Sequence, residues 1–292
     1  GLLHALNAQY PAATGGAPRF VLLHRVRTYS ATQQCWMGWE RKRGKLEQLV
    51  AQLATGVQGA FIDLGELSRL APDTRYVLTL DSDTQLPPGR LRSLVGVAEH
   101  PENRPRLDAA GQRVVQGYGI LQPRVLAPLP ERETTSLWQW LFAGQQGLDP
   151  YSAMTSDVYQ DFFAEGSFTG KGLLHVATLH AVLGGRLPTD QVLSHDLLEG
   201  ALARCAVVSD VTLVEAEPEH SDTAASRLHR WTRGDWQLWP FLAHARQWGL
   251  SPINRWKLTD NLRRSLVAPA SLLVVLLAMA GLGLPLSTTL AV

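Results

Sequence analysis

The sequence of 292 residues predicts an α/β domain with a mostly parallel sheet, then amphipathic helices at a membrane interface and a C-terminal transmembrane helix. Three observations support this prediction. Short apolar runs alternate with amphipathic stretches over most of the chain. A segment rich in tryptophan and arginine follows, and the last 28 residues carry no charged side chain. The predicted boundaries are 1–235 for the α/β domain, 236–265 for the interface helices and 266–292 for the transmembrane segment.

The predicted strands and helices alternate along the α/β domain. Residues 41–54 predict a helix that is basic at its start and apolar at helical spacing afterwards, and residues 91–98 predict a second helix. Because strands alternate with helices, we expect the strands to form one mostly parallel sheet. The short apolar runs typical of buried strands are residues 20–23, 76–80, 114–121 and 207–214.

The composition excludes several classes of protein. Lys plus Arg is 27 and Asp plus Glu is 26, so the chain lacks the basic excess of a protein that coats nucleic acid. With 45 % hydrophobic and 18 % charged residues, it can bury a core and is not a disordered chain. Two cysteines exclude a disulfide scaffold and indicate a reducing compartment. No base flanks Cys35, so we interpret it as a buried structural thiol.

The most specific local motif is a pair of aspartates at the end of a predicted strand. Asp81 and Asp83 follow the apolar run 76–80, and Pro87 and Pro88 then stop the strand. Ligands of open α/β sheets gather at the carboxyl ends of strands, and oxygen ligands favour Mg²⁺ or Mn²⁺. A bare D-x-D is most often a solvated turn, but this context favours a metal site.

A second acidic motif is LSHDLLEG, which contains Asp196 and Glu199. An ionised aspartate can accept a hydroxyl proton, so Asp196 is a candidate general base and Glu199 the alternative. Ser194 followed by acidic residues is equally typical of a helix N-terminus. Both interpretations stay open on the residues alone.

Three basic motifs are candidate anion sites. Arg227, Arg230 and Arg233 recur at i, i+3 and i+6 beside Trp231 and Trp236, which suits a diphosphate and a stacked sugar. Single-stranded nucleic acid would use the same residues but is disfavoured by the neutral overall charge. The other two are a helix start that carries Arg41, Lys42, Arg43 and Lys45 around Gly44, and a glycine-rich loop that carries Gly166, Ser167, Gly170, Lys171 and Gly172.

The glycine-rich loop is not a Walker A motif, because Gly172 follows Lys171 where Ser or Thr is required. Close approach of a carbohydrate or a phosphate is the interpretation that remains. For the basic helix start at residues 41–45, a solvated basic turn and an anion site remain equally open interpretations.

The uncharged run from residue 265 to 292 predicts a membrane span. At about 1.5 Å per residue it reaches roughly 40 Å, more than the ~30 Å of a hydrocarbon core. Pro269 and Pro285 limit the span, and Arg263 and Arg264 place its start in the cytoplasm by the positive-inside rule. A buried core helix is the alternative. The absence of an initial Met and the apolar C-terminus indicate a piece of a longer protein.

Together the motifs resemble the glycosyltransferase domain of cyclic β-1,2-glucan synthases, which are large bacterial inner-membrane proteins. The resemblance begins near Arg25 and reaches the membrane span. It implies a GT-A-type, Rossmann-like fold of the cellulose-synthase-like superfamily, whose pattern is D-x-D, an acidic base motif and Q/R-x-x-R-W. The stretches that carry it are CWMGWERKRGKLEQL, YVLTLDSDTQLPP, GYGILQPRV, LFAGQQGLDPY, SDVYQDFFAEGSFTGKGL, LSHDLLEGALAR and RLHRWTRGDWQ.

The resemblance implies roles for individual residues. Asp81 and Asp83 hold UDP-glucose through Mg²⁺ or Mn²⁺, with Asp83 the more direct ligand, and Asp196 is the catalytic base. His195 precedes Asp196 where the superfamily often has Glu, and Arg227 replaces Gln in the last motif. The implied donor and diphosphate residues are Arg41, Arg43, Lys45, Asp81, Arg227 and Arg230. The implied acceptor residues are Trp231, Gly166, Ser167 and Lys171.

The implied function is that of an inverting, membrane-bound glucosyltransferase that extends β-1,2-glucan from UDP-glucose on the cytoplasmic face of the inner membrane. Expected partners are UDP-glucose, the glucan acceptor, the bilayer and the upstream and downstream domains of the parent chain, with no nucleic acid. The alternatives are another processive β-glycan synthase and a non-catalytic nucleotide-sugar-binding fragment. Only about 20 residues precede the first motif, so we expect the fold to lack its first strand or strands.

Overall fold

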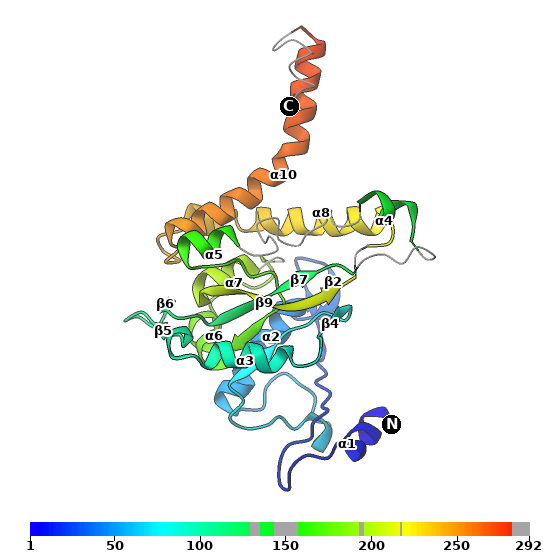
Figure 1. The fold of residues 1–292 in the computed structure, drawn as a ribbon, viewed down its shortest axis with the longest axis vertical. Coiled ribbons are helices and arrows are strands. Elements are labelled where there is room, and N and C mark those ends of the chain that lie inside the picture. Colours follow the sequence, from blue (N-terminus) through cyan, green and yellow to red (C-terminus); the bar gives the residue numbers. More distant parts are fainter. Residues whose placement is uncertain (129–134, 143–156, 193–195, 217, 282–292) are drawn as a thin grey trace.

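A computed structural model describes residues 1–128, 135–142, 157–192, 196–216 and 218–281 of the chain. Figure 1 shows a layered α/β body, with helix α8 lying across its upper face and helix α10 projecting away from it. The α/β character predicted from the sequence is therefore confirmed.

In the described part of the chain, the main sheet has five strands in the order β3-β8-β7-β9-β4. Among the described strands of this sheet, β7 and β9 are the one parallel pair and the other neighbours are antiparallel, so the expectation of a mostly parallel sheet is wrong. The antiparallel pairs all involve β8 or β4, two short strands that none of the predicted apolar runs includes. The strand bounds are β3 Tyr76–Leu78, β4 Thr84–Gln85, β7 Ile120–Leu126, β8 Leu173–His175 and β9 Cys205–Glu215.

Several predicted elements are confirmed. The runs at 76–80 and 207–214 form β3 and β9. The helices predicted at 41–54 and 91–98 are α2, Arg41–Thr55, and α3, Arg90–Glu99. The remaining described elements before the glycine-rich loop are α1 Leu2–Gln9, β1 Arg27–Ser30, β2 Cys35–Gly38, η1 Gly65–Ser68, η2 Pro101–Asn103, β5 Arg106–Leu107, β6 Val114–Gln116, α4 Leu137–Phe142 and α5 Val158–Phe163.

Three predictions about these elements are wrong. Residues 114–121 form β6 and β7 in different sheets, because Gly117 turns the chain at φ +65°, where a Cβ would lie 2.0 Å from the Arg104 carbonyl oxygen. Residues 20–23 form no strand. The Phe20 amide donates to Asn7 Oδ1 and the Phe20 carbonyl accepts from Asn7 Nδ2, so the Asn7 side chain takes the place of a strand partner. Cys35 lies on β2 and is exposed, so the prediction of a buried structural thiol is wrong; nothing in its neighbouring residues indicates that exposure.

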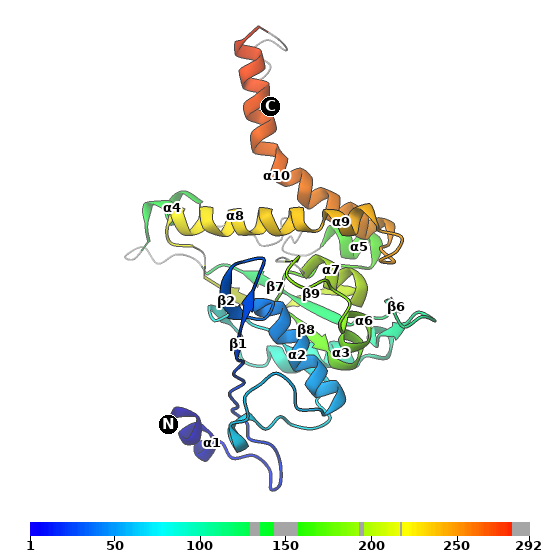
Figure 2. The same ribbon diagram turned by 180° about the vertical axis from the view of Figure 1, so that it is seen from behind.

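Side-chain alternation along the central strands divides the core between the two faces of the sheet. Ile120 and Leu174 pack with α2, α6 (Val176–Leu183) and α7 (Asp196–Ala203). Their sequence neighbours Leu121 and Leu173 pack with α3 on the other face. Figures 1 and 2 show these helices on opposite sides of the sheet. The strand ends are thereby fixed between two packed layers.

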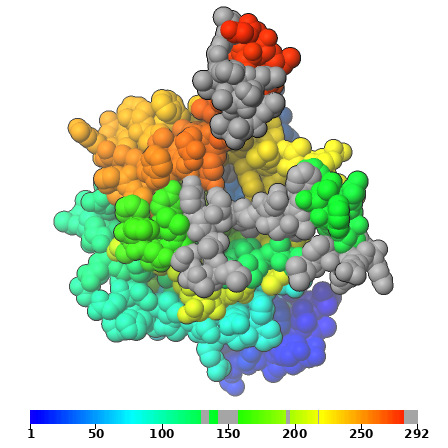
Figure 3. All heavy atoms as spheres, turned by 45° about the horizontal axis from the view of Figure 1, so that its top comes forward, coloured from blue at the N-terminus to red at the C-terminus, as the bar shows by residue number. Residues whose placement is uncertain are grey.

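The upper face carries α8 (Ser221–Gln237), α9 (Trp239–Ala243) and α10 (Pro252–Met279). Figure 3 turns this face forward and shows the orange base of α10 beside the yellow α8. Their side chains join where Trp236 Nε1 donates to Ser265 Oγ at 3.1 Å. Of the tryptophans in this region, Trp236, Trp239 and Trp256 are exposed, whereas Trp248 packs against the core; a membrane-interface belt stays a prediction.

Helix α10 is long and apolar enough to cross a bilayer. Its 28 residues extend about 42 Å. The mean hydropathy of its most apolar window is 1.7, and only 6 % of that window is buried, whereas a core helix would be mostly buried. Pro269 lies inside the helix rather than at its end, and Figures 1 and 2 show α10 bending along its length. The domain boundaries at 235 and 265 stay predictions, and residue 265 lies within the continuous α10.

A buried lysine fastens the base of α10 to the glycine-rich loop. Lys257 Nζ donates to the Glu165 carbonyl at 3.0 Å and to the Gly166 carbonyl at 2.7 Å. It also lies 3.8 Å from Glu165 Oε1 and 5.1 Å from the centre of the Tyr159 ring. Because these groups are buried, the ammonium replaces the water that their oxygens would otherwise bind.

We predict that Lys257→Met lowers the free energy of unfolding by about 2–3 kcal/mol, because buried carbonyls and a carboxylate lose their cation. In a chain of this size the change lowers Tm by about 5 °C, measurable by thermal unfolding in detergent. Lys45→Met is the matched control, since Lys45 is exposed. An unchanged Tm for Lys257→Met contradicts the contacts described for α10.

Candidate functional site

One cavity of about 800 Å³ lies between the sheet, the starts of α2 and α7, the face of α8 and the base of α10. Its size is that of a site for a substrate or cofactor. Among the residues predicted from sequence, Lys45, Gly166 and Glu199 do not line it. The predicted residues that do line it are Arg41, Arg43, Asp81, Asp83, Ser167, Lys171, Asp196, Arg227, Arg230 and Trp231.

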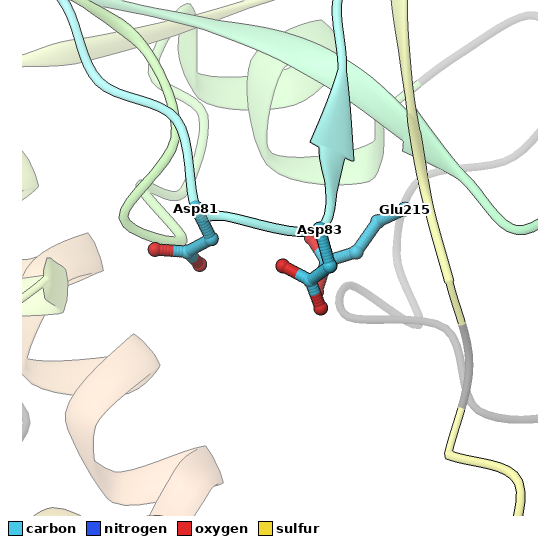
Figure 4. Close-up of side chains that lie close together, drawn as sticks. All are labelled: Asp81, Asp83 and Glu215. Carbon is cyan, nitrogen blue, oxygen red and sulfur yellow. The ribbon is translucent and has the colours of Figure 1, made fainter. Parts of the chain in front are cut away.

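Three carboxylates gather at the edge of the sheet. Asp81 begins a turn in which the Thr84 amide donates to the Asp81 carbonyl at 3.1 Å. Thr84 then pairs with Glu215 at the end of β9, and this register places Asp83 next to Glu215. Asp81, Asp83 and Glu215 each offer an oxygen within 4.8 Å of the others (Figure 4). The turn and the strand register together build a cluster that neither strand forms alone.

Sequence reasoning missed Glu215. A signal was available, because Glu215 directly follows the predicted strand 207–214, as Asp81 follows 76–80. The rule that ligands gather at the carboxyl ends of strands applies to both positions. What the sequence lacks is the pairing of β4 with β9, which brings the two strand ends together.

Cations surround this cluster. Lys42 Nζ lies 2.5 Å from Asp81 Oδ1 and also donates to the Gly170 carbonyl at 3.0 Å. Lys171 Nζ lies 3.3 Å from Asp81 Oδ2 and 2.6 Å from Glu215 Oε2, and the side chains of Lys171 and Glu215 are both 5 % exposed. Arg227 adds a contact of 3.5 Å to Glu215. The site therefore combines oxygen ligands for a cation with positive groups for an anion.

The charge of the Asp81 carboxyl is set by these neighbours. Burial by itself raises its pKa, but the hydrogen bond and charge of Lys42, together with Lys171, lower the pKa below its ordinary value. Asp81 is consequently held in its ionised form, which is the form that binds a metal or accepts a hydrogen bond.

The cluster fits a hard divalent cation, since three carboxylate oxygens can converge on one point. Lys42 and Lys171 occupy the same oxygens in this structure and would have to share them with an ion. Mg²⁺ or Mn²⁺ at this cluster stays a prediction.

Asp196 is the first residue of α7 and lies against the glycine-rich loop. Gly170 has φ +88°, and a Cβ on it would come within 3.0 Å of Asp196 Oδ2. Glycine at position 170 thus leaves room for the Asp196 carboxylate at the cavity wall. A helix is described from Asp196 onward, but Ser194 and His195, on which the predicted helix cap depends, lie outside the described residues.

The alternative base has a different environment. Glu199 lies one turn further along α7, is buried, and lines a separate small cavity between α2 and α6. Asp196 therefore faces the large cavity, whereas Glu199 faces the core.

On α8, two of the three predicted arginines face the cavity. The Arg227 guanidinium lies 5.4 Å from the centre of the Trp231 ring, and Arg230 lines the cavity beside them. Arg233 is exposed and does not line it. Six residues turn a helix by roughly 600°, which leaves Arg233 about 120° away from Arg227. The one-face interpretation is correct only for the first two arginines.

The basic start of α2 divides in the same way. Arg41 and Lys42 line the cavity, and Lys45 is exposed away from it. Arg43 borders the cavity but is 2 % exposed and pairs with Glu40 at 2.7 Å and Glu47 at 3.0 Å.

Gly166 packs against Val207, and its carbonyl accepts from Lys257. The ligand-binding roles expected for these residues stay predictions.

We predict that Lys42→Met lowers the free energy of unfolding more at neutral pH than at acid pH. Because the pKa of Asp81 is lowered in the folded state, its ionised form stabilises the protein above the unfolded pKa. That contribution is lost as pH falls through the folded pKa, so the variant and the wild type converge. Denaturant midpoints from about pH 7 to about pH 2 measure this, with Lys45→Met as the control. A difference that does not change with pH contradicts the prediction.

Comparison with known proteins gives one informative relative. No family model matches the chain. Over 267 residues, 91 % of its length, the chain is 48 % identical to cyclic beta-(1,2)-glucan synthase NdvB of Rhizobium meliloti (strain 1021). The chain spans 9 % of the length of that relative. The resemblance that the motifs predict is thereby confirmed: over nearly its whole length, the chain is homologous to one segment of a cyclic β-(1,2)-glucan synthase.

Proposed function

We propose that this chain is the glucosyltransferase segment, with a GT-A-type fold, of a membrane-bound synthase that transfers glucose from UDP-glucose to a growing β-1,2-glucan. The observation that carries the proposal is that Asp81, Asp83, Glu215 and Asp196 all border one cavity whose wall also holds cationic side chains. The identity of 48 % to a cyclic β-(1,2)-glucan synthase supports the same reaction.

The donor diphosphate binds at the carboxylate end of the cavity. Lys42, Lys171 and Arg227 already contact the carboxylates there, and Arg230 lines the wall beside them. These groups hold the charge that develops on the departing diphosphate. A divalent cation held by Asp81, Asp83 and Glu215 supplies further positive charge to that diphosphate when bound.

Asp196 acts as the general base. The acceptor 2-hydroxyl gives its proton to an Asp196 carboxylate oxygen, and the hydroxyl oxygen bonds to the anomeric carbon of the donor. The bond from that carbon to UDP breaks on the opposite face, and its electron pair leaves with the diphosphate. The reaction inverts the anomeric configuration. Trp231 packs against the acceptor sugar, as its position on the cavity wall allows.

The membrane anchor is α10, whose apolar half is exposed to the surroundings rather than to the protein. Arg263 and Arg264 precede that half, so we infer that the cavity faces the cytoplasm of a bacterial inner membrane. In this arrangement the glucan acceptor reaches the cavity beside the membrane surface.

The function is tested with membranes that contain the complete parent synthase. We expect radiolabelled UDP-glucose to give a 1,2-linked product that depends on Mg²⁺ or Mn²⁺ and is lost in Asp83→Ala. Glu215→Gln is expected to raise the metal concentration at half-maximal rate about tenfold, since one charged ligand is removed. Methylation analysis of the product determines the linkage. A 1,4-linked product indicates a different β-glycan synthase. Binding of UDP-glucose without formation of free UDP indicates a non-catalytic binding module.

A second prediction isolates the base. Asp196→Asn is expected to lower the transfer rate by about 10²–10⁴-fold, because the acceptor hydroxyl loses its proton acceptor, while UDP binding persists. Rates of UDP release and the affinity for UDP are measured in parallel. If Asp196→Asn transfers at a near-normal rate and Glu199→Gln does not, the base is Glu199.

A further inference from the structure

The end of the cavity next to α10 carries polar side chains that have no role in the donor site. Asp235 of α8 and Asn261 and Arg264 of α10 all line the cavity wall. On α10 the cavity-facing residues recur at i, i+4, i+7 and i+8, which is one helix face. They are Lys257, Asn261, Arg264 and Ser265.

Helix α8 spans the cavity from its donor end to its α10 end. Arg227 contacts Glu215 in the carboxylate cluster, and Asp235 lies eight residues further along the helix. Eight residues extend about 12 Å, with Trp231 halfway between them. All three side chains recur every four residues and face the cavity. A ligand seated on Trp231 can therefore contact the donor end on one side and Asp235 on the other.

The polar groups at this end are held in place mainly by α10. Asn261 Nδ2 donates to Asp235 Oδ1 at 3.4 Å, close to the limit for a hydrogen bond, and Arg264 donates to Asn261 Oδ1. Arg264 also lies 3.5 Å from Asp260 Oδ2, whose side chain is 2 % exposed. In the described part of the chain, Asn261 is the one hydrogen-bond donor to the Asp235 carboxylate. The Asp235 carboxylate thus has capacity for further donors from a ligand.

The chemistry of the three side chains matches a neutral polyhydroxyl ligand. A carboxylate only accepts hydrogen bonds, a guanidinium only donates them, and an amide does both, whereas each sugar hydroxyl can do either. A diphosphate is disfavoured here because Asp235 carries the same sign of charge. The donor end differs, since its lysines and Arg227 surround the carboxylates.

We propose that Asp235, Asn261 and Arg264 form a saccharide subsite, which binds hydroxyls of the growing glucan beyond the sugar packed on Trp231. This inference rests on the proposed function, because it extends the acceptor side of the same cavity. The three residues lie at or next to the base of α10, just before its exposed apolar half, so in this proposal the acceptor chain runs along α8 toward that helix.

The test uses the complete synthase in membranes, with short β-1,2-linked gluco-oligosaccharides as acceptor and as binding probe. Asp235→Asn keeps the shape of the side chain and removes its charge. We expect the acceptor KM and the oligosaccharide Kd to rise about tenfold, while the KM for UDP-glucose and the rate at saturating acceptor stay within about twofold. Asn261→Ala is expected to raise the same two constants.

The control is Asp222→Asn, the same substitution on an exposed position of α8. Tm measurements verify folding: burial raises the pKa of Asp235, so Asp235→Asn is expected not to lower Tm at neutral pH. Unchanged acceptor KM and Kd in both cavity variants overturn the subsite. If the wild type binds the oligosaccharide but transfers no glucose, the proposed function fails. The subsite is then tested by the oligosaccharide Kd of the variants, without the acceptor KM.

Discussion

The ion pair between Lys171 and Glu215 holds the candidate site together. Lys171 comes from the glycine-rich loop and Glu215 from the end of β9, and both side chains are almost fully buried. A buried charge without a partner is costly, so each residue requires the other in place. Lys171 also contacts Asp81, which ties the turn after β3 into the same network. Three segments far apart in the sequence are thereby fixed around one point.

Glycines and a second buried lysine complete this arrangement. Gly170 lets the Asp196 carboxylate approach the loop, and Gly166 lets the loop pack on Val207 of β9. Lys257 then binds the carbonyls of the same loop from α10. The helix that is apolar enough to enter a bilayer is consequently also a wall of the cavity. The same helix therefore contributes residues to the cavity wall at its base and an exposed apolar surface further along.

The fold could be predicted from sequence where local pattern decides it. Helix α2 and strand β9 follow from apolar spacing, and the apolar half of α10 follows from its lack of charge. Prediction failed where distant pairing decides. The run at 20–23 is as apolar as a strand, but Asn7 takes up the backbone groups of Phe20. Strand direction was also mispredicted, because nothing in the residues of β8 specifies that its neighbours run the opposite way.

The sequence by itself determined the chemical groups: the aspartate pair after β3, Asp196 at a helix start, the arginines and Trp231 of α8, and the resemblance to a glucan synthase segment. The tertiary structure alone decided which of these groups meet. It joined Glu215 to the aspartate pair through the β4–β9 register, buried Arg43 in ion pairs, and turned Glu199 toward the core. The reason is physical, since residue type fixes what a side chain can bind, while long-range pairing and packing fix what lies within its reach.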